Sequence, residues 1–337
     1  ASGTGSANYN SVTIFPTGTG FGIEGNISSP LIVLNGADNV IIDGRVMQTG
    51  STADLTIKNS STSAIAGTST IRFLNDATNN TVRYCNIKGS STGGVNGIIL
   101  FSTTTGTTGN DNNTIDNNNI TCSADASRPV YAIYSAGTLS LDNSGNVISN
   151  NNIYDVLNRG ISSNALYIAD NNSAWTISGN SFYETATFVP TASSNYFLIR
   201  INSASGNNFS VFDNYIGGSS ALCGGSAWTK TNIFNNAFTG IYINTSTGTA
   251  SSFQNNTIRN FNWSNSLNAN WTGIMIAGGD VNAGTVTGNN IGNTTGNGSI
   301  IVTGAATNTI VYGININGTG TVVCQNNKIG SVTSVND

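Results

Sequence analysis

The sequence predicts an all-β chain, a right-handed parallel β-helix of about ten three-strand coils joined by an asparagine ladder. Three observations lead to this fold class: a composition poor in helix formers, a short asparagine motif that recurs along the chain, and a second set of alternating apolar segments. The pattern favours one β-helix domain over residues 1–337. It divides that domain into an irregular first coil (1–30), regular coils (31–329) and a C-terminal tail (330–337).

The composition excludes most helical folds. Only 8% of the residues are charged, and glutamate occurs only at Glu24 and Glu184. Glycine and asparagine, which are abundant here, disfavour helix interiors. Apolar residues make up 38% of the chain, whereas disordered chains lack enough apolar surface to offset the entropy lost on ordering. The chain is therefore expected to fold, and to fold into strands.

The recurring motif has an apolar residue, an asparagine three positions later and a second apolar residue two positions after that. It occurs in TIDNNNI (114–120), VISNNNI (147–153) and TISGNSF (176–182). The interval between successive motifs varies, and an interval of 33 residues recurs. The first apolar residue of each motif is expected to stack inside the coil, which predicts the inward positions Ile115, Ile148, Ile177, Val211, Ile233, Phe253 and Val286. The predicted ladder asparagines are Asn118, Asn151, Asn180, Asn214, Asn236, Asn256, Asn289 and Asn327.

The second pattern is a strand with period-two alternation, often opened by glycine. Its copies are LIVL (31–34), IRFL (71–74), GIILF (97–101), FLIRI (197–201), GIYI (240–243), GIMI (273–276) and GINI (313–316). Each coil is expected to run from this strand to a second strand, through a tight turn with the asparagine, and into a third strand. A variable connection then returns to the next coil.

The asparagine suits the turn for two reasons. Asparagine tolerates the left-handed backbone of a sharp bend. Its amide carries both donors and an acceptor, so stacked asparagines can bond to one another along the rod. These asparagines are therefore predicted to be structural rather than part of a binding site.

Charge and residue usage exclude several functions. The net charge is −4 with no basic stripe, which argues against nucleic-acid binding. There is no apolar run long enough for a membrane span, and the small polar start ASGTGSANYN is typical of a mature secreted chain. Histidine is absent, which removes the commonest metal ligand and general base.

The four cysteines, Cys85, Cys122, Cys223 and Cys324, match no zinc-binding spacing. In a 33-residue coil Cys85 stacks on Asn118, which leaves Cys122 four residues further along the strand. That offset is roughly 13 Å along a strand, beyond the reach of a disulfide. The sequence therefore predicts no Cys85–Cys122 disulfide and leaves the state of the other two cysteines open.

From about Ser11 to Ile329, the asparagine turns and GIxI strands resemble the pectin-lyase-like right-handed β-helix family. The segments LIVLNGADNVIIDG (31–44), DLTIKNSS (54–61) and TNNTVRYCNI (78–87) resemble β-helix modules of large secreted surface proteins of Bacteroidota-type bacteria. That family includes polysaccharide lyases and hydrolases, adhesins and structural rods. The resemblance implies the fold and leaves the function open.

The chain departs from the enzymes of that family. Without histidine it has no Gly-His-Gly motif, it has no Arg-x-Lys motif, and its aspartates are scattered. We therefore expect no catalytic residues, cofactor or metal, and a structural or adhesive role outside the cell. The alternative is a carbohydrate-active enzyme, either a polysaccharide lyase or a glycoside hydrolase.

Four aspartates beside predicted turns are candidate sites. Asp116 and Asp213 both flank asparagine turns, but several coils should separate them, and paired glycosidase carboxyl groups lie within about 9.5 Å. Asp111 could bind calcium with nearby carbonyls, although a turn role is favoured. Asp43 is expected to form a local turn with Gly44.

Two further features bear on partners. Phe261, Trp263 and Trp271 stand in a polar loop, where they would either contact a carbohydrate or partner, or form an apolar cluster beneath the loop. Arg128, Arg159 and Arg200 have no acidic cluster near them in sequence, so an arginine base is a remote option.

The ends of the coil point to self-association. No capping helix is apparent before Leu31, and the last asparagine motif lies close to the end of the chain. Open strand edges invite pairing with another chain, and apolar residues at the ends, such as Ile14, Ile23, Val322 and Ile329, would otherwise face solvent. The expected partner is therefore a second copy in an end-to-end filament, or a surface polysaccharide.

Overall fold

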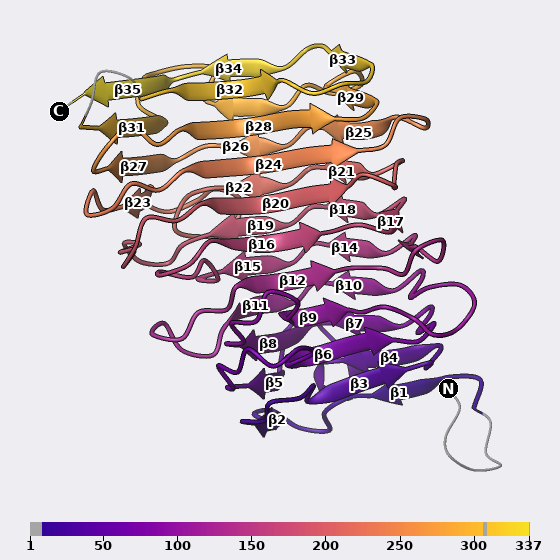
Figure 1. Ribbon diagram of the computed structural model, residues 1–337. Helices are drawn as coiled ribbons and strands as arrows, with labels where there is room; N and C mark the ends of the chain where they lie inside the picture. Colours follow the sequence, from indigo (N-terminus) through magenta and orange to yellow (C-terminus); the bar gives the residue numbers. More distant parts are fainter. Residues whose placement is uncertain (1–8, 306–308, 337) are drawn as a thin grey trace.

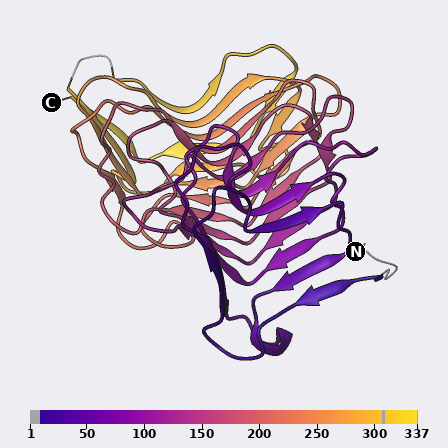
Figure 2. The same cartoon turned by 60° about the horizontal axis from the view of Figure 1, so that its bottom comes forward.

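The computed structural model describes residues 9–305 and 309–336 as a rod of stacked parallel strands (Figure 1). Two sheets of ten strands and one of nine run along the rod, and the chain visits the three in turn. This confirms the right-handed parallel β-helix and its ten coils. Figure 2, in which the N-terminal coils come forward, shows the sheets arranged around a common interior.

Each long sheet takes one strand from each successive coil. The first sheet consists of β1 (Val12–Ile14), β4 (Val40–Asp43), β7 (Thr81–Arg83), β10 (Thr114–Asp116), β14 (Val147–Ser149), β18 (Thr176–Ser178), β21 (Ser210–Phe212), β25 (Ser251–Gln254), β29 (Val281–Ala283) and β33 (Val322–Cys324). The second sheet consists of β2 (Gly22–Gly25), β5 (Leu55–Asn59), β8 (Cys85–Gly89), β11 (Asn119–Cys122), β15 (Asn152–Tyr154), β19 (Ser181–Tyr183), β22 (Tyr215–Ile216), β26 (Thr257–Ile258), β30 (Asn290–Gly292) and β34 (Lys328–Gly330). The third sheet consists of β3 (Ile32–Asn35), β6 (Ser69–Leu74), β9 (Gly97–Phe101), β12 (Tyr131–Ser135), β16 (Ser163–Ile168), β20 (Tyr196–Ser203), β24 (Phe238–Thr245), β28 (Trp271–Gly278) and β32 (Val311–Ile316).

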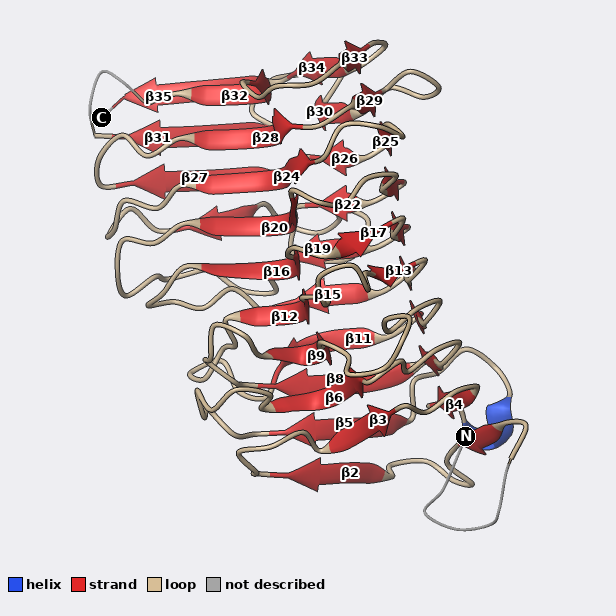
Figure 3. Cartoon of the chain, turned by 45° about the vertical axis from the view of Figure 1, so that its right-hand side comes forward, coloured by secondary structure: helices blue, strands red, loops and turns tan. Residues whose placement is uncertain are grey.

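Two smaller sheets lie in the connections. A fourth sheet, found only in the C-terminal half, consists of β23 (Trp228–Lys230), β27 (Phe261–Asn265), β31 (Ile300–Gly304) and β35 (Val332–Asn336). A two-stranded sheet consists of β13 (Asn143–Ser144) and β17 (Asn172–Ser173). The described residues contain one helical element, the short 3₁₀ turn η1 (Val46–Gln48), visible in Figure 3.

The strand assignments from sequence agree well with the structure. All seven alternating apolar segments lie in the third sheet, and the asparagine motif joins the first sheet to the second. Three features were missed: β12, β16 and the whole fourth sheet. The segment expected as a C-terminal tail, residues 330–337, contains β35, which pairs with β31.

The asparagine ladder is continuous over seven coils. The side-chain Oδ1 of Asn151 accepts both the backbone N–H of Asn118 (2.9 Å) and its Nδ2 (3.0 Å). The second Nδ2 hydrogen of Asn118 is donated to the carbonyl of Val82. The same arrangement repeats through Asn118, Asn151, Asn180, Asn214, Asn256, Asn289 and Asn327. Seven of the eight predicted ladder positions are thus confirmed.

The left-handed backbone of the turn does not lie at the ladder asparagine, where the sequence predicts it. The left-handed backbone belongs to the residue before six of the seven ladder asparagines, as at Asn117 (φ 55°) and Asn150 (φ 54°), the exception being Gly288 before Asn289. The ladder asparagines themselves are retained for their amides, since they are buried and their amide groups bond to the coils on either side. A second, unforeseen ladder runs through Asn80, Asn113 and Asn146.

Asn236 was wrongly assigned to the ladder. Asn256 stacks directly on Asn214, and the intervening segment that holds Asn236 lies between the fourth and third sheets. There the N–H of Asn236 is donated to Oδ1 of Asn265 (2.9 Å), which also accepts from the Lys230 ammonium (2.9 Å). Asn236 therefore matches the motif only by chance. It lies in a connection between sheets that the buried Lys230 holds in place.

Five of the seven predicted inward residues are fully buried, namely Ile115, Ile148, Ile177, Val211 and Phe253. The other two are wrong. Ile233 lies in the connection just described and is 57% exposed, and Val286 is 84% exposed. In that coil Ala283 pairs with Phe253 and takes the inward position, so the chain makes a longer loop before reaching Asn289.

This correction predicts a contrast between two matched substitutions. Val211→Ala is expected to lower the free energy of unfolding by about 2–3 kcal/mol, because it removes two buried methyl groups and leaves a cavity. Val286→Ala should change it by less than about 0.5 kcal/mol. Denaturant unfolding of both variants checks this. A large loss of stability from Val286→Ala would mean that Val286, rather than Ala283, takes the inward position.

Candidate functional site

The outer face of the third sheet carries a row of aromatic side chains that was not foreseen from the sequence. Parallel register places Tyr134 beside Tyr167, Tyr167 beside Arg200, and Arg200 beside Tyr242. The sheet forms the long foreground face of the rod in Figure 1. Because equivalent residues stack at each coil, one outward position becomes a continuous column.

A second column lies next to the first and adds Tyr131 and Phe197. The Tyr131 and Tyr134 rings stack with centroids 5.0 Å apart, and the Phe197 and Tyr242 rings meet edge to face at 5.7 Å. We call Tyr131, Tyr134, Tyr167, Phe197, Arg200 and Tyr242 the third-sheet stripe. Apart from the buried Tyr134, its members are half-buried, so they combine fixed ring positions with accessible faces.

Arg200 stands at the centre of the stripe. Its guanidinium carbon lies 4.7 Å from the Tyr167 ring centroid, 4.8 Å from that of Phe197 and 5.5 Å from that of Tyr242. Cation–π contacts of this kind are favourable and fix the orientation of the guanidinium.

The charge of Arg200 has no carboxylate partner among the described residues. Arg45, Arg83, Arg128 and Arg159 all form ion pairs. Arg200 forms none, and its Nε–H is enclosed without an acceptor. An arginine held this way, half-exposed among aromatic rings, is available to bind a carboxylate or sulfate in the paired geometry that guanidinium favours.

Two tyrosines of the stripe have raised pKa values. Burial, together with the neighbouring Tyr167 and Tyr131, raises the pKa of Tyr134 to about 12, and burial also raises the pKa of Tyr131. The stripe therefore presents hydroxyl groups and ring faces with a single positive charge, which suits a ligand with both apolar faces and an acidic group.

A charged cluster lies at the corner between the second and third sheets. Three successive connections contribute to it: Asp125 and Arg128, then Asp155 and Arg159, then Glu184. We call these five residues the corner cluster. The sequence shows no acidic cluster around Arg128 and Arg159, but the fold assembles one, because Asp155 and Glu184 stand in the coils that follow Asp125 and Arg128.

Glu184 is the unusual member of the corner cluster. Its side chain is fully buried, and it forms an ion pair with Arg128, which is 3% exposed. Burial raises the pKa of Glu184 to about 8, the Arg128 charge opposes that shift, and the neighbouring Asp155 carboxylate adds to it. A carboxyl enclosed in this way cannot reach a polymer on the surface, so the cluster is placed to hold three connections together.

The other acidic candidates have structural contacts. Asp116 accepts from Ser149 and Asn150 of the next coil, and Asp213 accepts from Asn255. Register places Asp213 three coils beyond Asp116, roughly 14 Å at the usual strand spacing. That separation exceeds the reach of a paired glycosidase site.

Asp111 and Asp43 also serve their local structure. Asp111 accepts the backbone N–H of Ser144 (2.7 Å), and the described residues hold no group of three acidic, cysteine or histidine side chains fit for a metal. Asp43 accepts the N–H of Arg45 (3.1 Å), which confirms the local turn. It also pairs with Arg45 and Arg83, which the sequence did not indicate.

The predicted aromatic contact residues are buried. Phe261 and Trp263 point inward from β27 and Trp271 from β28, and each is at most 1% exposed. They pack with Phe238, whose ring stacks on Trp271 at 5.5 Å. The segment is therefore two strands around an apolar cluster, and these rings offer no face to a carbohydrate or partner.

The cysteines follow the predicted register. The backbone N–H of Cys85 bonds to Oδ1 of Asn118, and Cys122 lies opposite Gly89. All four cysteines are free.

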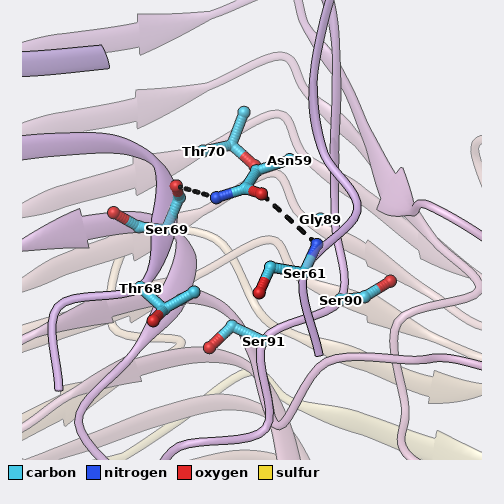
Figure 4. Close-up of a pocket in the computed structure, with 9 residues that line it drawn as sticks. Asn59, Ser61, Thr68, Ser69, Thr70, Gly89, Ser90 and Ser91 are labelled. Carbon is cyan, nitrogen blue, oxygen red and sulfur yellow. Dashed lines mark hydrogen bonds between the residues drawn. The ribbon is translucent and has the colours of Figure 1, made fainter. Parts of the chain in front are cut away.

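A polar box between the second and third sheets is closely packed. Asn59 donates to the carbonyl of Ser69 (3.0 Å) and accepts the N–H of Ser61 (3.3 Å), as drawn in Figure 4. The side chains around it leave no room for a water molecule. It is a structural network rather than a binding site.

No family model matches the chain, and no curated protein matches it. In the part of the chain that the structure describes, no helix has the length and apolar character needed to cross a membrane.

Proposed function

We propose that this chain is a non-catalytic adhesive β-helix of the pectin-lyase-like type, exposed at a cell surface, which binds an acidic polysaccharide along the third sheet. The observation that carries the proposal is Arg200, an arginine with no carboxylate partner held among three aromatic rings. Aromatic and arginine side chains are the residues that most often anchor an interface.

The dimensions of the third-sheet stripe suit an extended polymer. From Tyr134 to Tyr242 the stripe crosses four adjacent coils, roughly 14 Å between the first and last strands. Met275 and Tyr312 continue the two columns towards the C-terminal end. A chain of sugar rings lying along the rod could therefore meet a ring face at several coils and place an acidic group on Arg200.

A catalytic role has no comparable support. The close carboxyl groups of the corner cluster include the enclosed Glu184. Asp43, Asp111, Asp116 and Asp213 bond to neighbouring coils. The resemblance to secreted surface modules, together with the composition, is what places the proposed site of action outside the cell.

End-to-end stacking is supported less well than polymer binding. Ile14 in the first coil and Ile329 in the last are 40% and 53% exposed. The faces differ, however, because the third strand of the last coil is β35 of the fourth sheet, whereas that of the first coil is β3 of the third sheet. The N–H of Asn327 would need an asparagine in the next coil, and the turn FPTGTGF (15–21) of the first coil offers none. We therefore do not extend the proposal to a filament.

The test compares dextran, which is neutral, with dextran sulfate and alginate, which are acidic. The protein is expected to bind at least one acidic polymer and to bind dextran far more weakly. Arg200→Gln should weaken that binding by roughly tenfold or more, the loss typical of a charge-assisted contact, and Tyr242→Ser should weaken it further.

Arg259→Gln is the matched control, because Arg259 lies outside the stripe and contacts Asn293 rather than an acid. It should bind like the wild type. Equal loss in both arginine variants would indicate non-specific attraction, and failure of every acidic polymer to bind would overturn the proposal.

A further inference from the structure

A hollow of about 530 Å³ crosses the turn between the first and second sheets, on a different face from the third-sheet stripe. It is lined by Asn150, Gly179, Phe212, Asp213, Tyr215 and Leu222. Asn255 of the following coil completes the lining, so the walls come from four different coils and no single stretch of sequence indicates the hollow.

The hollow arises at a turn position where one coil has a glycine and the coils on either side have larger residues. In the outward turn position before each ladder asparagine, coils five and seven carry Asn150 and Asp213, while coil six carries Gly179. In the next column, Ser149 and Ser178 of coils five and six are followed by the much larger Phe212 of coil seven. Coils five and seven are about 9.5 Å apart at the usual strand spacing, and only the end of the Asn150 side chain lies over Gly179 between them, which leaves an open slot beside Phe212.

Aromatic and apolar side chains form one wall of this slot. Phe212 and Tyr215 flank Asp213 on coil seven and are half-buried. Leu222 reaches the slot from the loop after β22, where its backbone N–H is bound by Ser181 Oγ (3.0 Å) and its side chain is 58% exposed. Leu222 has a φ of 59° and Cys223 a φ of 57°. Such conformations are costly for these residues and tend to occur where function requires them.

The polar groups of the slot are mainly acceptors. Asp213 uses Oδ1 to accept from Asn255 (2.7 Å), and Asn150 uses Nδ2 to donate to Asp116 (3.0 Å). This leaves Asp213 Oδ2 and Asn150 Oδ1 without a protein donor. No lysine or arginine lines the hollow, so the slot favours a ligand that donates hydrogen bonds and carries no negative charge.

We infer that this slot is a second binding site, which takes a single ring of a neutral saccharide. The ring would lie against Phe212 and Tyr215, and its hydroxyl groups would donate to Asp213 and Asn150. Apolar ring faces and hydroxyl donors occur together in sugars, and the slot offers an aromatic wall and free acceptors that complement both. The inference is independent of the proposed function, because the two sites share no residue and favour ligands of different charge.

Filling the slot is the sharpest test. Gly179→Asn places in coil six the residue type that coils four, five and eight have at the same turn position, and asparagine tolerates the backbone of Gly179 (φ 67°). The new side chain would displace only the end of the Asn150 side chain. Phe212→Ser removes the aromatic wall and matches Ser178 in the coil before it.

The measurement is saturation-transfer NMR of the full chain with maltose, cellobiose, lactose and mannobiose as probes. At least one disaccharide is expected to give a signal, and Gly179→Asn and Phe212→Ser should each weaken its binding by roughly tenfold or more. Arg200→Gln should leave it unchanged, and Gly179→Asn should leave binding of acidic polymers unchanged.

Thermal unfolding of each variant keeps the result interpretable, because Gly179→Asn is expected to melt close to the wild type. Absence of a signal from all four disaccharides, or a signal that survives Gly179→Asn in the folded variant, would overturn the inference. Loss of the disaccharide signal in Arg200→Gln instead would show that the sugar binds to the third-sheet stripe.

Discussion

Asn151→Ala is expected to lower the free energy of unfolding by about 3–6 kcal/mol, since each buried polar group left without a partner costs about 1–3 kcal/mol. Asn151 is 1% exposed. Its Oδ1 accepts two hydrogen bonds from Asn118, and its Nδ2 donates to the Ile115 carbonyl and to Asn180. Alanine would leave the two Asn118 donors and the Ile115 carbonyl without these partners, while water cannot enter to replace them.

The adjacent residue provides the control. Asn152 lies on the outer face of the second sheet, where its side chain donates to Asn119 (3.0 Å). Asn152→Ala should cost less than about 1 kcal/mol, because solvent can replace that bond. Denaturant unfolding with an unchanged m-value measures both, and equal losses would mean that the ladder contributes no more than a surface contact.

The wild-type protein is expected to lose stability as the pH rises from acidic to alkaline values, and Glu184→Gln is expected to remove most of that loss. Burial raises the pKa of Glu184 from its usual 4.5 to about 8. Between those values the folded protein holds a proton that the unfolded chain has released, so this group makes stability fall as pH rises through that range. The melting temperature of the wild type should therefore decrease from pH 5 to pH 9.

The glutamine variant keeps the shape of the side chain and has no proton to lose. It can still accept from Arg128 and donate to Asp155, so its melting temperature should no longer fall between pH 5 and pH 9 and should exceed that of the wild type at pH 9. Burial lowers the pKa of Lys230 to about 7, which acts in the opposite direction above pH 7 in both proteins. Glu24→Gln, at the exposed pair with Lys58, should keep the wild-type profile. A pH profile that is unchanged by Glu184→Gln would show that the corner cluster accommodates the ionised carboxyl without cost.

The sequence was most informative where the same chemistry recurs in every coil. The inward position of Ile115 and the amide of Asn118 both need the same side chain at each layer, so a fixed spacing reveals them. The spacing fails at Val286, because Ala283 takes the inward place and the loop after it lengthens. It fails at Asn236 as well, because a connection between sheets carries the same letters without the same neighbours.

The candidate sites were hidden for a related reason. Tyr167 and Arg200 meet only because one coil brings residues 33 positions apart into register, and β16 (SNALYI) lacks the glycine-isoleucine start that marked other third-sheet strands. Arg128 and Glu184 are likewise 56 positions apart in the sequence. Trp263 was misjudged because its polar neighbours suggested a loop, whereas alternation in β27 turns the ring inward.

The most direct test of the proposed function is a crystal structure of the full chain with a bound alginate or sulfated dextran oligosaccharide. We expect the ligand to lie along the third sheet, with an acidic group at the Arg200 guanidinium, sugar rings against Tyr167 and Tyr242, and every glycosidic bond intact. A ligand bound to another face, or one shortened by the protein, would contradict a non-catalytic adhesive role for the third-sheet stripe.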